Sequence, residues 1–243
     1  MFSILQSEWY KLLKSRIMSI VFAGPILSFL LGVSIPERPE FADFNKWFLT
    51  LNMMNLTYSL LFLPLFSGVL ASMICRYEHQ AGGWKQYLTL PVTRGQVFVA
   101  KYILILLVIL FIQLFYLAAI YAVGMVKGYP DPFPMGIVWK SIFGGWVATF
   151  PLVALQLWTS IIWKSFAAPF TVNVLFTLPA ILAVNSERFG PYYPWGQPFL
   201  MMYACESGEG VFIVPWEQLL VVVGGSFLVF FIAGYWSLQK KAF

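Results

Sequence analysis

Long apolar runs, separated by short polar segments, dominate the hydropathy pattern of this chain. Six of these runs contain no Asp, Glu, Lys, Arg or His, and they span residues 17–35, 48–75, 102–126, 141–163, 165–186 and 218–239. Each run is near or above the roughly 20 residues that a helix needs to cross the hydrocarbon core of a bilayer. The pattern therefore predicts an all-α membrane protein with six transmembrane helices, organised as one membrane domain over residues 1–243.

The first 16 residues have a different pattern. Apolar side chains recur there at spacings of three and four, at Phe2, Leu5, Trp9, Leu12 and Leu13, while charged residues occupy other positions on the helical wheel, at Glu8, Lys11 and Lys14. This spacing predicts an amphipathic helix at the membrane surface, with its lysines near anionic lipid. Two interpretations remain open for residues 1–16: a lead-in to the first span, or a separate in-plane helix that also contacts a cytosolic partner.

The distribution of basic residues predicts the orientation of the spans. With the N-terminus in the cytosol, ten bases fall on the inside, at Lys11, Lys14, Arg16, Arg76, Lys85, Arg94, Lys101, Lys164, Lys240 and Lys241. Five fall outside, at Arg38, Lys46, Lys127, Lys140 and Arg188. The inside loops of membrane proteins carry the excess of Lys and Arg, so the pattern predicts that both termini are cytosolic.

Composition supports membrane insertion and argues against several classes of function. The 243 residues are 60% hydrophobic and only 10% charged, whereas about a quarter of a typical soluble domain is charged. The net charge of +5 reflects the cytosolic loops and does not indicate nucleic-acid binding. The absence of ionisable residues from the six runs disfavours ion-coupled transport. The chain has no GxxxxGK[ST] phosphate-binding loop, and we expect no directly bound cofactor and no metal site.

One polar segment, residues 76–101, lies between the second and third runs and combines several unusual features. It carries Arg76, Lys85, Arg94 and Lys101 against a single acid, Glu78, and it holds the only histidine of the chain, His79. A Gly82–Gly83 pair permits a tight turn, and Pro91 stops the preceding helix because it lacks an N–H group. The pattern predicts a short cytosolic helix, with a simple solvated basic loop as the alternative.

The order of residues in this segment resembles that of ABC-2 type permeases, the membrane subunits of ATP-binding-cassette exporters. The features that carry the resemblance are Glu78, the Gly82–Gly83 turn, the stretch from Leu88 to Arg94, and Lys101. The amphipathic N-terminal helix, the six spans and the large external loop at 187–217 match the family in topology. Trp84 and Lys85 depart from the family, in which many members carry a small residue and an acid.

The resemblance implies that residues 76–101 include a coupling helix that docks on a separate ATPase subunit. It also implies an assembly of two ATPases with two permease chains, either identical or paralogous, in the plasma membrane of a bacterium. ATP would act only through the partner subunit, so the chain itself is not an enzyme. We expect the coupling contacts to come from Glu78, Gly82, Gly83, Trp84, Lys85, Tyr87, Pro91 and Arg94. Within the family, the short length of the chain makes it most similar to the permeases of lantibiotic-immunity and bacitracin-resistance exporters.

Polar side chains within the spans are candidates for a substrate path. They are Asn52, Asn55, Gln113, Gln156 and Asn173. Hydrogen bonding between helices is the other role open to them. An uncharged, aromatic interior suits an amphipathic peptide or a lipid-like molecule taken from the bilayer. The aromatic, proline-rich part of the loop at 187–217 is interpreted as an interfacial belt or as a re-entrant lid.

A different class of function stays open on sequence grounds, namely a membrane anchor or sensor that transports nothing and binds a cytosolic partner. Copurification with an ATPase would distinguish the two. A lipid-modifying enzyme is disfavoured because the external loop holds no histidine and no recognisable pair of acids.

Overall fold

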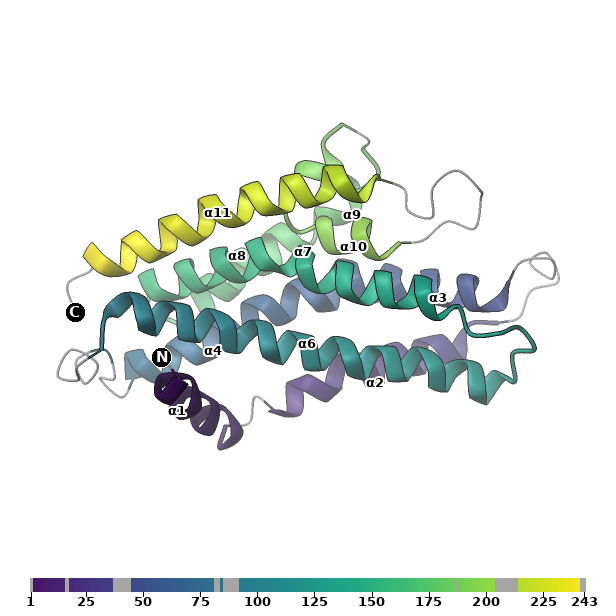
Figure 1. Cartoon of the computed structure of the whole chain (residues 1–243), viewed down its shortest axis with the longest axis horizontal. Coiled ribbons are helices and arrows are strands. Elements are labelled where there is room, and N and C mark those ends of the chain that lie inside the picture. The colour runs from purple at the N-terminus through teal and green to yellow at the C-terminus, as the bar shows by residue number, and fades with distance from the viewer. Residues whose placement is uncertain are drawn as a thin grey trace.

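The computed structural model describes residues 2–15, 18–36, 45–80, 84, 92–186, 188–203 and 214–240, and these residues form an elongated helical bundle (Figure 1). The long helices run roughly along the long axis of the molecule. The end of α4, the start of α6 and the end of α11 all lie at one end of the bundle, near α1. The described residues contain no strand, which agrees with the predicted all-α class.

The helices follow one another as α1 (Phe2–Leu13), α2 (Met18–Ser34), α3 (Lys46–Thr57), η2 (Tyr58–Phe62), α4 (Leu63–Gln80), α6 (Arg94–Lys127), α7 (Met135–Ile162), α8 (Ala167–Thr177), α9 (Ala180–Ala183), η3 (Gly190–Tyr192), α10 (Gln197–Met202) and α11 (Trp216–Lys240). Four of the helical segments in the described part of the chain are long and apolar enough to cross a membrane: Lys46–His79, Arg94–Lys127, Met135–Ile162 and Glu217–Lys240. They contain the predicted runs 48–75, 102–126 and 218–239, and all of the run 141–163 except its last residue, Trp163.

The first and fifth predicted spans correspond to shorter apolar helices, Val21–Ser34 and Ala167–Ala183. At about 1.5 Å per residue, 17 residues of helix cover about 25 Å, a few ångströms less than the hydrocarbon core. Crossing by helices of this length would require local thinning of the bilayer. The number of six spans therefore stays a prediction.

The helix α6 is the longest α-helix of the described residues, and it packs against α1, α2, α3, α4, α7 and α11. Its N-terminus carries a capping box, in which the Thr93 side chain accepts from the Gln96 N–H and the Gln96 side chain accepts from the Thr93 N–H. The helix ends at Lys127 and is capped by Gly128, whose positive φ of 64° is a conformation that favours glycine. Because α6 already begins at Arg94, and α4 continues to Gln80, the part of segment 76–101 that joins them is shorter than we expected.

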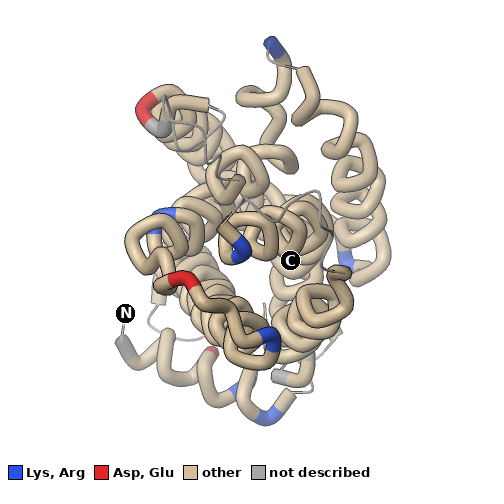
Figure 2. The backbone as a smooth tube through the Cα atoms, turned by 90° about the vertical axis from the view of Figure 1, so that its right-hand side faces the viewer, with Lys and Arg blue, Asp and Glu red and all other residues tan. Residues whose placement is uncertain are grey.

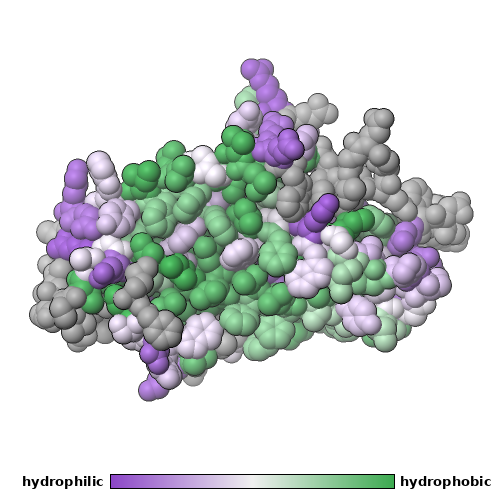
Figure 3. All heavy atoms as spheres, viewed as in Figure 1, coloured by the Kyte–Doolittle hydropathy of each residue, from purple (hydrophilic) through white to green (hydrophobic). Residues whose placement is uncertain are grey.

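The surface of the bundle is apolar around its middle. Hydrophobic residues fill the middle of the face in Figure 3, whereas the left and right ends are richer in hydrophilic ones. In the end view of Figure 2, Lys, Arg, Asp and Glu lie at isolated places along tubes that are otherwise uncharged. Large apolar side chains that remain exposed include Leu182, Val221 and Val229. This distribution is the one expected for a bundle surrounded by lipid.

The continuous helical segment Lys46–Gln80 changes its pitch in the middle. A π-helical turn covers Tyr58–Phe62, two positions before Pro64. Proline cannot donate a backbone N–H, so the regular hydrogen-bond ladder is interrupted at this point. Within the turn, the Tyr58 ring stacks on Tyr116 of α6, with centroids 3.6 Å apart and planes 2° from parallel.

Candidate functional site

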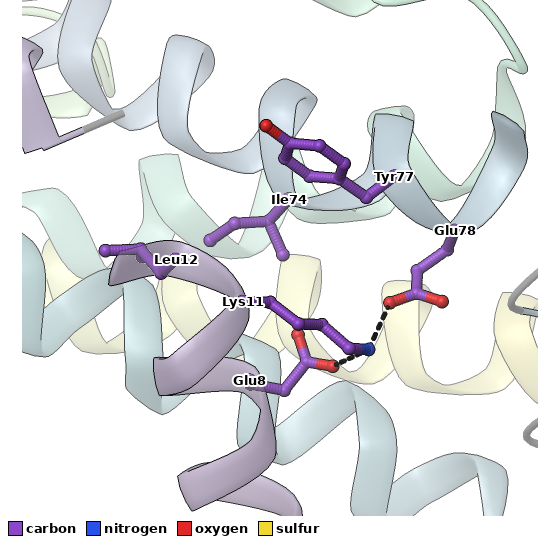
Figure 4. Close-up of a pocket in the computed structure, with 6 residues that line it drawn as sticks. All are labelled: Glu8, Lys11, Leu12, Ile74, Tyr77 and Glu78. Carbon is purple, nitrogen blue, oxygen red and sulfur yellow. Dashed lines mark hydrogen bonds and ion pairs between the residues drawn. The ribbon is translucent and has the colours of Figure 1, made fainter. Parts of the chain in front are cut away.

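Four charged side chains from three helices meet next to the segment that links α4 to α6. Lys101 Nζ of α6 lies 2.7 Å from Glu8 Oε2 of α1 and 3.1 Å from Glu78 Oε1 of α4. Lys11 Nζ lies 3.0 Å from Glu8 Oε1 and 2.9 Å from the same Glu78 oxygen. We call these residues, Glu8, Lys11, Glu78 and Lys101, the ion cluster. Figure 4 shows Lys11 between the two carboxylates, which come from different helices.

Most of the ion cluster is withdrawn from water. The side chain of Lys101 is 0% exposed, and those of Glu8 and Glu78 are 2% and 4% exposed, whereas Lys11 is 46% exposed. Two positive and two negative charges balance, which is the condition under which buried charges are tolerated. Partial burial lowers the pKa of Lys11, but the opposing charge of Glu8 and the hydrogen bonds to Glu78 and Glu8 outweigh it and raise that pKa above its usual value.

The position of Glu8 corrects our expectation for the amphipathic helix. Ile4, Glu8 and Leu12 are buried and spaced by four, so they form the face of α1 that packs on the bundle. The predicted apolar residue Leu13 is instead 45% exposed. Glu8 lies on the buried face because Lys101 provides a partner there. We had expected Glu8 to lie on the polar face of the amphipathic helix with the lysines, and this expectation was wrong.

A second set of contacts holds Trp84, the one described residue between Gln80 and Val92. Trp84 is buried, and its indole Nε1 donates to His79 Nδ1 over 3.2 Å. Because Nδ1 accepts, the neutral imidazole carries its proton on Nε2, which lies 3.1 Å from the main-chain carbonyl oxygen of Ser160 in α7. The Trp84 ring also lies 5.9 Å from Lys101 Nζ. Trp84 thus contacts α4 and α6, and His79 extends the contacts to α7.

The residues that we predicted as ATPase contacts fall into different environments. Glu78 and Trp84 are buried and have partners within the chain, and Lys101 lies close to both. Arg94 Nη1 donates to the main-chain oxygens of Leu238 and Gln239, near the end of α11, at 3.4 Å and 3.0 Å. The remaining predicted contacts lie outside the described residues, as does the predicted coupling helix itself, and they are Gly82, Gly83, Lys85, Tyr87 and Pro91.

Four members of this arrangement were missing from the predicted site: Glu8, Lys11, His79 and Lys101. Lys101 had been noted as one of the basic residues of the segment 76–101 and as part of the family pattern. The available signal for Glu8 was an isolated acid in a helix whose other charges are basic. Spacing along one helix cannot show which basic residue of another helix will pair with it.

Four of the five predicted path residues, Asn55, Gln113, Gln156 and Asn173, take part in two buried hydrogen-bond networks. In the first, Asn55 Nδ2 donates to the main-chain oxygen of Met202 over 2.8 Å, and Asn55 Oδ1 accepts from the Tyr116 hydroxyl over 2.8 Å. Ser141 Oγ also donates to the Met202 oxygen, over 2.9 Å. Gln113 Nε2 reaches the thioether sulfur of Met202 at 3.8 Å. Elements α3, α6, α7 and α10 are joined in this way.

The second network is centred on Asn173 of α8. Its Oδ1 accepts from Gln156 Nε2 at 3.0 Å and from Trp195 Nε1 at 2.8 Å, and its Nδ2 donates to the main-chain oxygen of Pro64 at 2.9 Å. These contacts are the helix-to-helix hydrogen bonds that we had considered as the alternative to a substrate role. Asn52 is half-buried.

Part of the predicted external loop enters the bundle. All six residues of α10, Gln197–Met202, are buried, and Trp195 is buried just before them. They pack against α7 and the π-helical turn η2. This segment therefore lies inside the bundle, and the interpretation as a re-entrant lid stays a prediction.

Comparison with known families identifies the chain. The family model described as ABC-2 family transporter protein matches residues 4–180. No curated protein matches the chain significantly. The matched region contains the whole ion cluster, the contacts of Trp84 and most of the two polar networks. Because the match covers well over half of the sequence, the chain belongs to the ABC-2 family of membrane transport proteins.

Proposed function

We propose that this chain is the permease subunit of an ATP-driven exporter, in which two permease chains assemble with two copies of a separate ATPase subunit. The family match over residues 4–180 is the observation that carries this proposal. Members of the family generally act as transport subunits and lack an ATPase motif of their own. The energy for transport then enters through contacts with another protein.

The ion cluster supports a mechanical route for that energy. A displacement of the segment that contains Trp84 would act on His79 and Lys101, and through Lys101 on Glu8 and Glu78. Separating these charges leaves at least one of them buried without a partner, which costs about 3–5 kcal/mol. Movement of α1, α4 and α6 as a unit is therefore favoured over movement of one helix alone.

The chemistry of the interior supports a substrate that is apolar or amphipathic. The polar side chains buried in the middle of the bundle are uncharged amides and hydroxyls, among them Asn55, Gln113 and Asn173. We propose an amphipathic peptide antibiotic of the lantibiotic or bacteriocin kind, or a lipid-like molecule, removed from the bacterial plasma membrane.

Copurification tests the proposal. The full chain carrying an affinity tag would be extracted from its native membranes in a mild detergent, and the proteins recovered would be identified by mass spectrometry. We expect an ATPase with a phosphate-binding loop in roughly equal molar amount, and we expect Trp84→Ala to reduce its recovery. Recovery of a partner without such a loop would support a membrane anchor or sensor instead.

A further inference from the structure

The C-terminal carbonyl of α10 is held by side chains that belong to the long helices. The main-chain oxygen of Met202 accepts from Asn55 Nδ2 at 2.8 Å and from Ser141 Oγ at 2.9 Å. Asn55, Ser141 and Met202 are all fully buried. The last carbonyls of a helix lack intrahelical partners, so α10 gains from these two donors. The same donors would serve any other carbonyl group placed between them.

Gln113 lies beside Met202, and its side-chain amide makes few hydrogen bonds. Its side chain is fully buried, its Nε2 reaches only the thioether sulfur of Met202, and its Oε1 has no hydrogen-bond partner among the described residues. A buried amide oxygen without a partner is costly. A group that donates a hydrogen bond to Gln113 Oε1 would remove that cost, and Met202 cannot do so because its side chain has no donor.

Gly145 of α7 provides the space for this contact. A methyl group placed on Gly145 would lie 2.3 Å from Met202 Sδ and 2.6 Å from Gln113 Nε2. The methionine therefore fits only because position 145 has no side chain. Gly136, on the same helix, has nothing within 4 Å of the corresponding position.

We propose that Asn55, Gln113 and Ser141 form a binding site for a peptide amide, and that α10 occupies this site in the present structure through the Met202 carbonyl. A ligand amide supplies both groups that the site requires, a carbonyl that accepts from Asn55 and Ser141 and an N–H that donates to Gln113. A lipid ester supplies only the carbonyl. The site thus selects an apolar peptide over a lipid, and binding requires α10 to leave. This inference rests on the proposed transport function and narrows its substrate to peptides.

Two variants that weaken the packing of the Met202 side chain, one by adding a methyl group beside it and one by removing the side chain, test the proposal. Gly145→Ala leaves too little room for the methionine, whereas Met202→Ala removes the side chain and cannot overpack the site. Gly136→Ala is the matched control, on the same helix and in open space. Each full-length protein, in lipid nanodiscs, would be titrated with radiolabelled N-dodecanoyl-alanine methylamide and, separately, with methyl dodecanoate, which has a carbonyl but no N–H.

We expect Met202→Ala to bind the amide probe at least about five-fold more tightly than wild type or Gly136→Ala, because the competing conformation is less populated. Gly145→Ala should show a smaller gain, because its methyl group would also crowd Gln113 Nε2. Adding Asn55→Leu or Gln113→Leu should abolish the gain. Equal amide binding by all four proteins would overturn the proposal, and so would an equal gain for the ester. Binding is measured without an ATPase, so failure here leaves the permease assignment to be judged by copurification alone.

Discussion

Lys101 Nζ lies 2.7 Å from Glu8 Oε2, which joins two residues 93 positions apart across the interface of α1 and α6. Neither side chain is accessible to water to any useful extent. The contact explains how a short N-terminal helix, which could otherwise rest on the membrane surface, is fixed to the long helix α6. Phe111 and Trp9 extend the same interface, with ring centroids 6.1 Å apart.

Neutralising Glu8 should destabilise the protein strongly. Glu8→Gln keeps the shape of the side chain but leaves Lys101 with one acidic partner, and we expect the free energy of unfolding to fall by about 3 kcal/mol. Equilibrium unfolding in mixed micelles measures the change. Lys14→Gln, at an exposed position directly after α1, is the control and should change stability by less than about 0.5 kcal/mol. Equal effects of the two variants would contradict a buried, structural ion cluster.

The contribution of Lys11 to stability should depend on pH at the alkaline end. Its pKa is raised above the ordinary 10.5 in the folded protein, so its stabilising effect is complete below 10.5 and is lost as the pH rises through the folded-state value. The difference in melting temperature between wild type and Lys11→Met should therefore stay constant from pH 7 to pH 9 and shrink above about 10.5. A difference that shrinks already near neutral pH would contradict this assignment.

Removing the indole of Trp84 should cost more than removing only its N–H. Trp84→Phe loses the bond to His79 and should lower stability by about 1 kcal/mol, whereas Trp84→Ala also empties a buried space and should cost about 3–5 kcal/mol. Trp236, which is 61% exposed, provides the matched control. Trp236→Ala should have little effect in detergent, and a similar loss from both alanine variants would argue against an anchored Trp84.

A variant of Asn173 distinguishes the two roles considered for the polar residues of the spans, namely hydrogen bonding between helices and contact with the substrate. Asn173→Leu leaves Gln156, Trp195 and the Pro64 carbonyl without a common partner, and we expect a loss of about 3 kcal/mol, from several unsatisfied groups. The exposed Asn185, whose side-chain amide donates to the main-chain oxygen of Ile181 in its own segment, is the control as Asn185→Leu. Unchanged stability with lost transport would instead indicate direct contact with substrate.

Hydropathy located the main helices because 20-residue apolar runs have few alternative structures. It placed the ends less well: charged residues such as Arg94 and Lys101 were read as loop, although they continue α6 beyond the apolar run. The partners of Glu8 and Asn173 could not be predicted, since they depend on how helices distant in sequence pack together. The burial of α10 could not be predicted either, because its aromatic and proline-rich sequence is compatible both with the membrane–water interface and with the interior of the bundle.

ATP hydrolysis by the complex recovered with this chain tests the central claim most directly. Wild type and Lys101→Met would be tagged, extracted from native membranes in mild detergent and assayed at matched amounts of permease. We predict hydrolysis that coelutes with wild type and falls by at least about tenfold with Lys101→Met, as expected if about 1.4 kcal/mol of coupling is lost. Absence of hydrolysis above background with intact wild-type protein would contradict the assignment as an ATP-driven permease.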